Sequence, residues 1–262
     1  MEKIVLPLRI IGKVVIFLTV AAVYFTSSFW IHLTVKGVNN RRRRFSDNAA
    51  KYTKLVCQLY NIKIEVHNSP ISHEAGLIVG NHLGFIDILV MHSLTKALFI
   101  TSEEMRRTPL LGIITEMAGC MYVDRKNRAN IKGELGSIVN TLNDGFRVTL
   151  YPEATSHNGE EVLPFKRTLL SAATLAQKPI FPYCFNFKSI NGQPFSMKNR
   201  DSVCWYGDMT FFASFIRSCG LKEVVTEVIF LEPYYPKPDE DRADVADKIR
   251  QMIVEKFKPV QK

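Results

Sequence analysis

The sequence predicts an α/β fold: a mixed, largely parallel sheet flanked by helices, with an N-terminal membrane-anchoring helix. Three observations support this fold class. Short apolar runs of strand length alternate with helical segments along residues 55–262. Residues 14–35 contain no charged side chain, and most of the net positive charge lies in residues 1–54. We therefore expect a membrane anchor with a basic juxtamembrane segment at 1–54 and one α/β domain at 55–262.

The net charge of +9 belongs to the N-terminus and not to the whole chain. Residues 1–54 hold ten Lys or Arg and two acidic residues, a net charge of +8. The other 208 residues hold 24 basic and 23 acidic side chains, a net charge of +1. A diffuse nucleic-acid-binding surface is therefore not expected from the charge.

The cysteines indicate a protein that folds without disulfides. There are five of them, and none forms a C-x-x-C pair. This pattern argues against a disulfide framework or a cysteine-rich zinc site, and it suits a reducing compartment. With 262 residues, the chain is long enough to bury a core without such cross-links.

The uncharged stretch at 14–35 has 22 residues, close to the roughly 20 that cross a bilayer core as a helix. Tyr24, Trp30 and His32 suit a membrane interface. The run is too long for a signal peptide, and no A-x-A cleavage site follows it. A spanning helix, a helix lying in the interface and a buried core helix remain the alternatives.

Arg41–Arg44 follow the apolar stretch closely. Juxtamembrane basic clusters attract anionic headgroups by about 1 kcal/mol per residue. Three basic residues precede the stretch and seven follow it within twenty residues, so the positive-inside rule predicts a membrane protein whose α/β domain faces the cytoplasm. The alternative for the arginine run is a solvated linker.

The elements of the domain follow from periodicity. Residues 62–67 alternate apolar and polar side chains, as a half-buried strand does, and the continuous apolar run 76–81 predicts a central strand. Further strands are expected at 97–101, 120–124, 147–152, 179–187 and 223–231. Helices are expected at 46–60, 87–94, 129–143, 168–176 and 240–257, with Gly145 as the C′ residue of the third.

A histidine and an aspartate five residues apart follow the central strand. The two side chains can meet if His82 sits in the turn and Asp87 in the first turn of a helix, with Gly84 allowing the chain to fold back. Asp87 would then fix one imidazole nitrogen and leave the other as a general base. The alternative is a structural histidine with no catalytic role.

Other polar residues follow strand ends, where open α/β sheets place their ligands. Glu153 and Thr155 come after the strand at 147–152, Lys166 ends the same loop, and Arg125 follows the strand at 120–124. Arg and Lys supply charge for a phosphate or similar anion. The alternatives are solvated surface charges and, for Glu153, a salt bridge within the loop.

Four segments together resemble the glycerolipid acyltransferase family, which includes the 1-acyl-glycerol-3-phosphate acyltransferases. The segments are N-H-L-G-F-I-D, with its H-x4-D motif, then G-C-M-Y-V-D-R, Y-P-E-A-T-S and P-I-F-P-Y, in the expected order over residues 81–183. The resemblance implies transfer of a fatty acyl group from acyl-CoA or acyl carrier protein to a lysolipid hydroxyl, with 1-acyl-glycerol-3-phosphate as the leading acceptor and phospholipid biosynthesis as the role.

The resemblance also assigns roles. His82 would be the general base, Asp87 would orient it, and backbone N–H groups near Gly84 or the third segment would hold the oxyanion. The expected substrate-binding residues are Asn81, Gly84, Arg125, Glu153, Thr155 and Lys166. No metal or organic cofactor is expected. The expected partners are membrane lipids and the acyl donor.

Two departures from the family pattern concern the third segment. Ala154 stands in place of a glycine, which restricts backbone conformations with positive φ. Ser156 stands in place of an arginine, so a bidentate contact to an acceptor phosphate is lost, and Lys166 would not restore its geometry. Alternatives are therefore an acceptor with a substituted headgroup, lyso-ornithine lipid, a non-catalytic lipid-binding protein or a thioester hydrolase.

Overall fold

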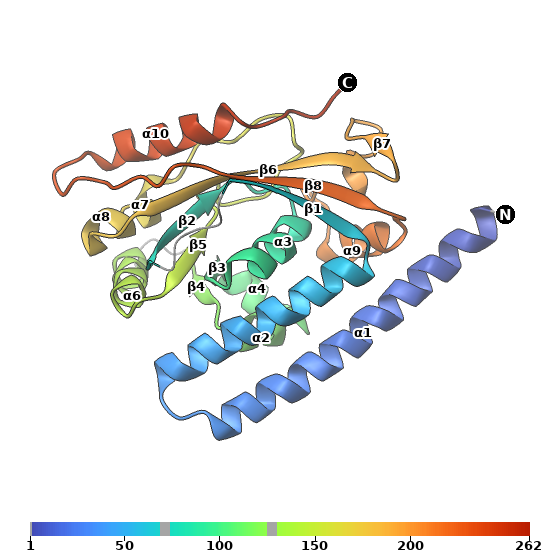
Figure 1. Ribbon diagram of the computed structural model, residues 1–262, viewed down its shortest axis with the longest axis horizontal. Helices are drawn as coiled ribbons and strands as arrows, with labels where there is room; N and C mark the ends of the chain where they lie inside the picture. Colours follow the sequence, from blue (N-terminus) through green and yellow to red (C-terminus); the bar gives the residue numbers. More distant parts are fainter. Residues whose placement is uncertain (1, 69–73, 125–129) are drawn as a thin grey trace.

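The computed structural model describes residues 2–68, 74–124 and 130–262 (Figure 1). One eight-stranded sheet has the order β1-β8-β6-β2-β5-β3-β4, with β7 paired to β6. The strands are β1 (Ile62–His67), β2 (Gly76–Gly80), β3 (Leu98–Ser102), β4 (Met121–Val123), β5 (Arg147–Leu150), β6 (Ile180–Ile190), β7 (Gln193–Pro194) and β8 (Val224–Phe230).

The middle of the sheet is parallel and one side is not. β2 pairs in parallel with β5 and β6, and β3 pairs in parallel with β5 and β4. β8 runs antiparallel to β6 and parallel to β1. The prediction of a mixed, largely parallel sheet flanked by helices is confirmed.

Helices cover both faces of the sheet (Figure 1). One face packs against α1 (Glu2–Thr34), α2 (Val38–Leu59), α3 (Phe85–Thr95), α5 (Leu111–Met117) and α9 (Phe211–Cys219). The other packs against α6 (Ile131–Asn143), α7 (Arg167–Leu170), α8 (Ala172–Ala176) and α10 (Arg242–Val254). The short α4 (Glu103–Arg106) and the 3-10 helix η2 (Arg200–Ser202) complete the described elements.

Strand β2 is the centre of both cores. All five of its residues are buried. Leu77 and Val79 face the α6–α10 side, whereas Ile78 faces the α1–α3 side, as the two-residue repeat of a strand requires. The strand can therefore consist of apolar residues and glycine alone, as parallel strands covered on both faces do.

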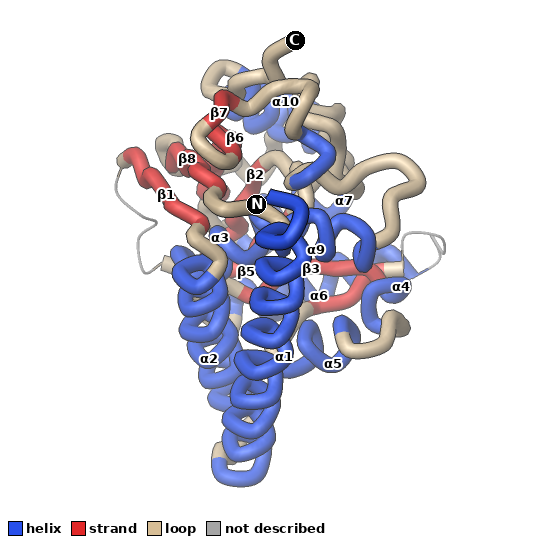
Figure 2. Tube along the Cα trace, turned by 90° about the vertical axis from the view of Figure 1, so that its right-hand side faces the viewer, coloured by secondary structure: helices blue, strands red, loops and turns tan. Residues whose placement is uncertain are grey.

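Helix α1 lies lengthwise on the domain, beside α2, with α9 and α5 near its other side (Figure 2). Near its start, Lys13 Nζ donates to the carbonyls of Tyr60 and Leu221 at 2.9 and 2.8 Å. Further along, the Tyr24 hydroxyl donates to Ile114 O at 3.1 Å, and Asn48 of α2 donates to Ser28 Oγ at 2.9 Å. The contacts between α1 and the domain thus extend over most of the helix.

Several elements differ from the sequence prediction. Helix α2 begins at Val38, after Gly37 at φ 84°, and not at residue 46. Arg41–Arg44 are therefore helical rather than a linker, and α2 continues across the expected domain boundary at residue 54. Helices α4, α5 and α9 were not predicted from the sequence; the first two are short, and periodicity is a weak signal over so few residues.

Candidate active site

The sheet places two of the sequence motifs side by side. β2 and β5 are adjacent parallel strands, with Val79 paired to Leu150. Their carboxyl ends therefore meet at one edge of the sheet, where His82 follows β2 and Glu153 follows β5. The backbone N–H of His82 donates to Glu153 Oε1 at 3.3 Å.

His82 and Asp87 form a close pair. His82 Nδ1 lies 3.0 Å from Asp87 Oδ1, with His82 in the turn after β2 and Asp87 in the first turn of α3. Asp87 Oδ2 also accepts the backbone N–H groups of Leu83 and Gly84 at 2.6 and 2.9 Å. The buried carboxylate is thereby held by three donors, and the helix N-terminus further favours its charge.

The other nitrogen of His82 is available for chemistry. No residue of the described ranges donates to or accepts from Nε2, and 12% of the His82 side chain is exposed. The Tyr151 ring stacks on the imidazole at 4.2 Å between centroids and 22° between planes. Asp87 and Tyr151 together fix the orientation of the ring, and Nε2 is the ring nitrogen left without a partner among the described residues.

Gly84 is required by a close approach of the chain. A Cβ atom there would lie 2.9 Å from Val203 O and 3.2 Å from Trp205 N, and Trp205 N donates to Leu83 O at 2.9 Å. The N–H groups of Leu83 and Gly84 both point to Asp87. The expectation that N–H groups at Gly84 hold an oxyanion therefore does not fit this geometry, because that donor already serves the carboxylate.

The third segment forms a loop closed by Lys166 N, which donates to Pro152 O at 2.7 Å. Glu153 lies buried in it, and burial raises the pKa of its carboxyl, while contacts with His157 and His82 oppose this. Ala154 adopts φ 59°, so the chain takes the glycine-type conformation in spite of its side chain, at a cost of about 1–2 kcal/mol.

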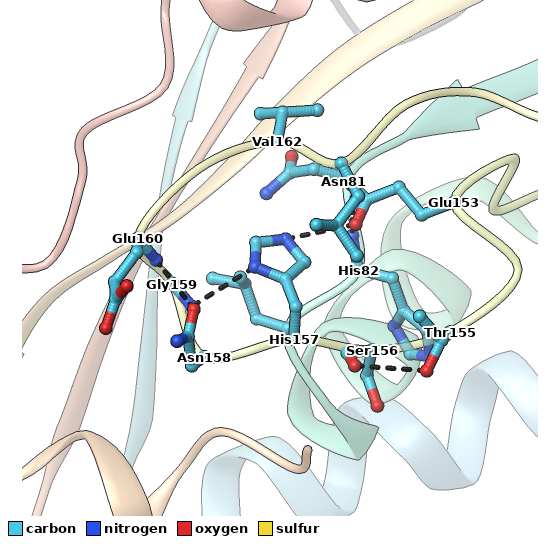
Figure 3. A network of polar contacts seen from close by, with 12 residues as sticks. Asn81, His82, Glu153, Thr155, Ser156, His157, Asn158, Gly159, Glu160 and Val162 are labelled. Atoms are coloured by element: carbon cyan, nitrogen blue, oxygen red, sulfur yellow. Dashed lines mark hydrogen bonds and ion pairs between the residues drawn. The ribbon is translucent and has the colours of Figure 1, made fainter. Parts of the chain in front are cut away.

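The remaining predicted residues lie in different places. Thr155 is exposed beside the site, and its hydroxyl donates to Ser156 O at 3.2 Å (Figure 3). The Lys166 side chain is exposed. Within the described residues it makes no hydrogen bond or ion pair with His82. Arg125 lies outside the described residues. The site therefore brings together His82, Asp87 and Glu153.

Asn81 is buried and bonded to the neighbouring strand. Its side chain donates to Phe185 O at 2.9 Å and accepts from Phe185 N at 2.8 Å. Both ends of the amide thus bind β6, which fixes the end of β2 just before His82. Contact of Asn81 with a substrate stays a prediction.

Three residues of the site were missed by sequence reasoning. Tyr151 stacks on His82, His157 contacts Glu153, and the backbone of Trp205 covers Gly84. The Ser156 hydroxyl donates to Trp205 O. Tyr151 and His157 stand within four residues of Glu153, and this closeness in sequence could have indicated that they belong to the site. Trp205 is distant in sequence and offered none.

One other cluster has donor atoms suitable for a cation. Glu65, His67 and Glu227 converge on β1 and β8. However, Lys188 Nζ lies 2.7 Å from Glu65 and Lys258 Nζ lies 2.7 Å from Glu227. These ammonium groups already balance the carboxylates, which fits a set of ion pairs on the sheet.

The structure thus places a histidine, oriented by a buried carboxylate, at the edge of a largely parallel sheet, an arrangement suited to proton transfer in an α/β enzyme. Residues 63–186 match the family model described as Acyltransferase. Over these residues the chain is similar to the acyltransferase family.

Two curated relatives extend the match. The chain is 27% identical to the lyso-ornithine lipid O-acyltransferase of Brucella abortus (strain 2308) over 248 residues, 90% of this chain and 91% of that protein. It is 27% identical to the 1-acyl-sn-glycerol-3-phosphate acyltransferase of Neisseria gonorrhoeae over 194 residues, 74% of each chain.

A solved structure shares the fold. The crystal structure of the 1-acyl-sn-glycerophosphate (LPA) acyltransferase PlsC from Thermotoga maritima matches with a TM-score of 0.73. The match covers 98% of this chain and 96% of that chain at 16% identity. The two proteins therefore share a fold over nearly their whole length.

Proposed function

We propose that the protein transfers a fatty acyl group from an acyl thioester to the free hydroxyl of a lysolipid at a membrane surface. The observation that carries this proposal is the pair His82–Asp87, with Nδ1 held at 3.0 Å from the carboxylate. This arrangement leaves Nε2 free to take a proton from a substrate hydroxyl. General bases of this kind contribute about 10²–10⁴-fold to rate.

The reaction needs only proton transfer at one atom. Nε2 of His82 takes the hydroxyl proton as the lysolipid oxygen attacks the thioester carbon. The tetrahedral intermediate collapses with cleavage of the C–S bond, and the proton on Nε2 passes to the departing thiolate. Asp87 stabilises the imidazolium between these two steps. The donor is acyl-CoA or acyl carrier protein.

The membrane arrangement that we propose is an interfacial one. Residues Val5–Thr34 of α1 are long and apolar enough to cross a bilayer. However, α1 is bound along its length to the domain through Lys13, Tyr24 and Ser28. Its outer face carries exposed apolar residues such as Leu8 and Trp30, 63% and 67% exposed. A helix with one docked face and one apolar face suits insertion into a single leaflet, on the cytoplasmic side as the basic residues predict.

The leading acceptor is 1-acyl-sn-glycerol-3-phosphate, which would give phosphatidic acid. A second candidate is a lysolipid with another headgroup, including lyso-ornithine lipid. It is favoured by Ser156, which carries no charge and whose hydroxyl donates to Trp205 O. Position 156 therefore supplies no positive charge for a phosphate.

The test is acyl transfer by the purified protein in mixed micelles. Two labelled donors are used, acyl-CoA and acylated acyl carrier protein. Each is offered with 1-acyl-glycerol-3-phosphate, lyso-ornithine lipid, lysophosphatidylethanolamine or no acceptor. We expect labelled diacyl product with at least one lysolipid. Labelled free fatty acid formed without acceptor would instead indicate a thioester hydrolase, and lipid binding without turnover would indicate a non-catalytic protein.

A further inference from the structure

A second histidine lies next to the base. His157 is buried, with 5% of its surface exposed, and the proposed proton transfer does not use it. Its backbone N–H donates to His82 O at 3.2 Å. Glu153 Oε1 accepts the His82 N–H at 3.3 Å. Both polar groups of the His82 main chain are thus bound by two residues of the third segment.

The side chains of these two residues also meet. His157 Nε2 lies 3.0 Å from Glu153 Oε2, with 6% and 0% of the side chains exposed, and Figure 3 shows the ring and the carboxylate pointing toward each other. The two atoms lie within contact distance, but their geometry falls outside that of an aligned hydrogen bond. Such a buried carboxylate depends on its few donors.

The tautomer of His157 follows from its other nitrogen. Gly159 N donates to His157 Nδ1 at 3.2 Å, so Nδ1 must carry a lone pair. The proton of the neutral imidazole is then on Nε2, the atom that faces Glu153. Val260 N in turn donates to Gly159 O at 2.8 Å, which holds the loop in this arrangement from the C-terminal side.

We propose that His157 is a positioning residue for the base: through Glu153 it fixes the main chain of His82 and thereby the place of Nε2. The inference rests on the proposed function of His82. Asp87 holds the His82 ring, whereas the Glu153–His157 pair holds the His82 peptide. Loss of supporting partners of a reacting group typically costs about 10–100-fold in activity.

The test compares His157→Leu with His157→Gln. Leucine removes the donor, whereas the glutamine amide can still present an N–H to Glu153. For His157→Leu we expect kcat to fall about 10–100-fold, with KM for donor and acceptor changing by less than about threefold, a factor that corresponds to about 0.65 kcal/mol. His157→Gln should recover most of kcat. Equal losses in both variants, or full activity in His157→Leu, would overturn the proposal.

A double-mutant cycle separates positioning from folding. In a Glu153→Gln background, His157→Leu should add little further loss, because the carboxylate that His157 holds is already gone. His92→Leu is the matched control, since His92 is also buried but stacks on Phe99, and it should keep wild-type kcat. Additive losses in the cycle would contradict the proposal.

A spectroscopic readout is independent of activity. In 15N-histidine-labelled protein, His157 should show a protonated Nε2 and an unprotonated Nδ1, with the Nε2 signal shifted in Glu153→Gln. The reverse tautomer would overturn the inference whatever the turnover. If instead His82→Ala kept full activity while His157 showed the expected tautomer, the failure would belong to the proposed function.

Discussion

His82 Nδ1 lies 3.0 Å from Asp87 Oδ1, and the same carboxylate accepts the N–H groups of the two residues that follow His82 in the chain. The aspartate therefore orients the ring and also closes the turn that carries it. This double role explains why a pair five residues apart can act as one unit. It also means that Asp87 cannot be changed without affecting both the His82 ring and the turn.

Asp87→Asn should lower kcat by about 10²–10⁴-fold. The amide keeps the size of the side chain but removes the charge that stabilises the imidazolium, and it can present a donor to Nδ1. The free energy of unfolding should also fall, by about 1–3 kcal/mol, because the Leu83 and Gly84 N–H groups lose a charged acceptor. Turnover and denaturant unfolding of the purified variant check both effects. Unchanged kcat would show that Asp87 has no part in orienting the base.

Gly84→Ala should destabilise the site. The new Cβ would lie 2.9 Å from Val203 O and 3.2 Å from Trp205 N, and these are main-chain atoms that cannot rotate away. We expect a loss of about 1–3 kcal/mol in the free energy of unfolding, with a lower kcat. Gly133→Ala is the control, because a Cβ there meets nothing within 4 Å, and its stability should not fall. Equal stability of the two variants would contradict the packing described.

The stability contribution of Glu153 should depend on pH in a defined direction. Burial raises the pKa of its carboxyl above the usual 4.5, so the folded state binds the proton more tightly than the unfolded state. The stability that the group contributes is then present below pH 4.5 and is lost as the pH rises through the folded-state pKa. Relative to Glu153→Gln, the wild type should lose about 1.4 kcal/mol for each unit by which the pKa is raised. Urea unfolding of both proteins between about pH 4 and 8 measures this; a wild-type stability that rises with pH relative to Glu153→Gln would refute it.

Position 156 should affect two properties that can be measured separately: the stability of the segment around Trp205 and the preference for an acceptor. Ser156→Ala removes the donor to Trp205 O and should cost about 1 kcal/mol of stability, with the ratio of activities toward different acceptors unchanged. Ser156→Arg adds a positive charge and should raise kcat/KM for 1-acyl-glycerol-3-phosphate relative to lyso-ornithine lipid by about tenfold, the effect of one charged hydrogen bond. An unchanged ratio in Ser156→Arg would mean that this position does not face the acceptor headgroup.

The fold was largely predictable because the strands carry their own signals. β2 is a continuous apolar run and β1 alternates, and both lie where periodicity places them. The sequence also predicted that His82 and Asp87 can meet if one sits in the turn and the other in the first turn of a helix, as the structure has them. By contrast, the contact between Glu153 and His82 depends on the strand order, which places β5 beside β2. The closeness of Trp205 to Gly84 depends on a long-range approach that no local pattern encodes.

In the N-terminal region, too, a local sequence pattern predicts the element but not its contacts. Hydropathy identified α1 but could not distinguish crossing the bilayer from lying on it. Its docked face is defined by contacts in the structure, among them those of Lys13, whose ammonium binds two main-chain carbonyls of the domain. An average of hydropathy over the helix does not reveal that a single lysine within it binds the domain.

The central claim is that Nε2 of His82 is the base of an acyl transfer. The most direct measurement is the rate at which purified His82→Ala forms labelled diacyl lipid from the donor and acceptor that the wild type uses. The account predicts a loss of at least about 10²-fold in kcat, with a far-ultraviolet circular dichroism spectrum and unfolding midpoint like those of the wild type. Full activity in a folded His82→Ala protein would contradict it.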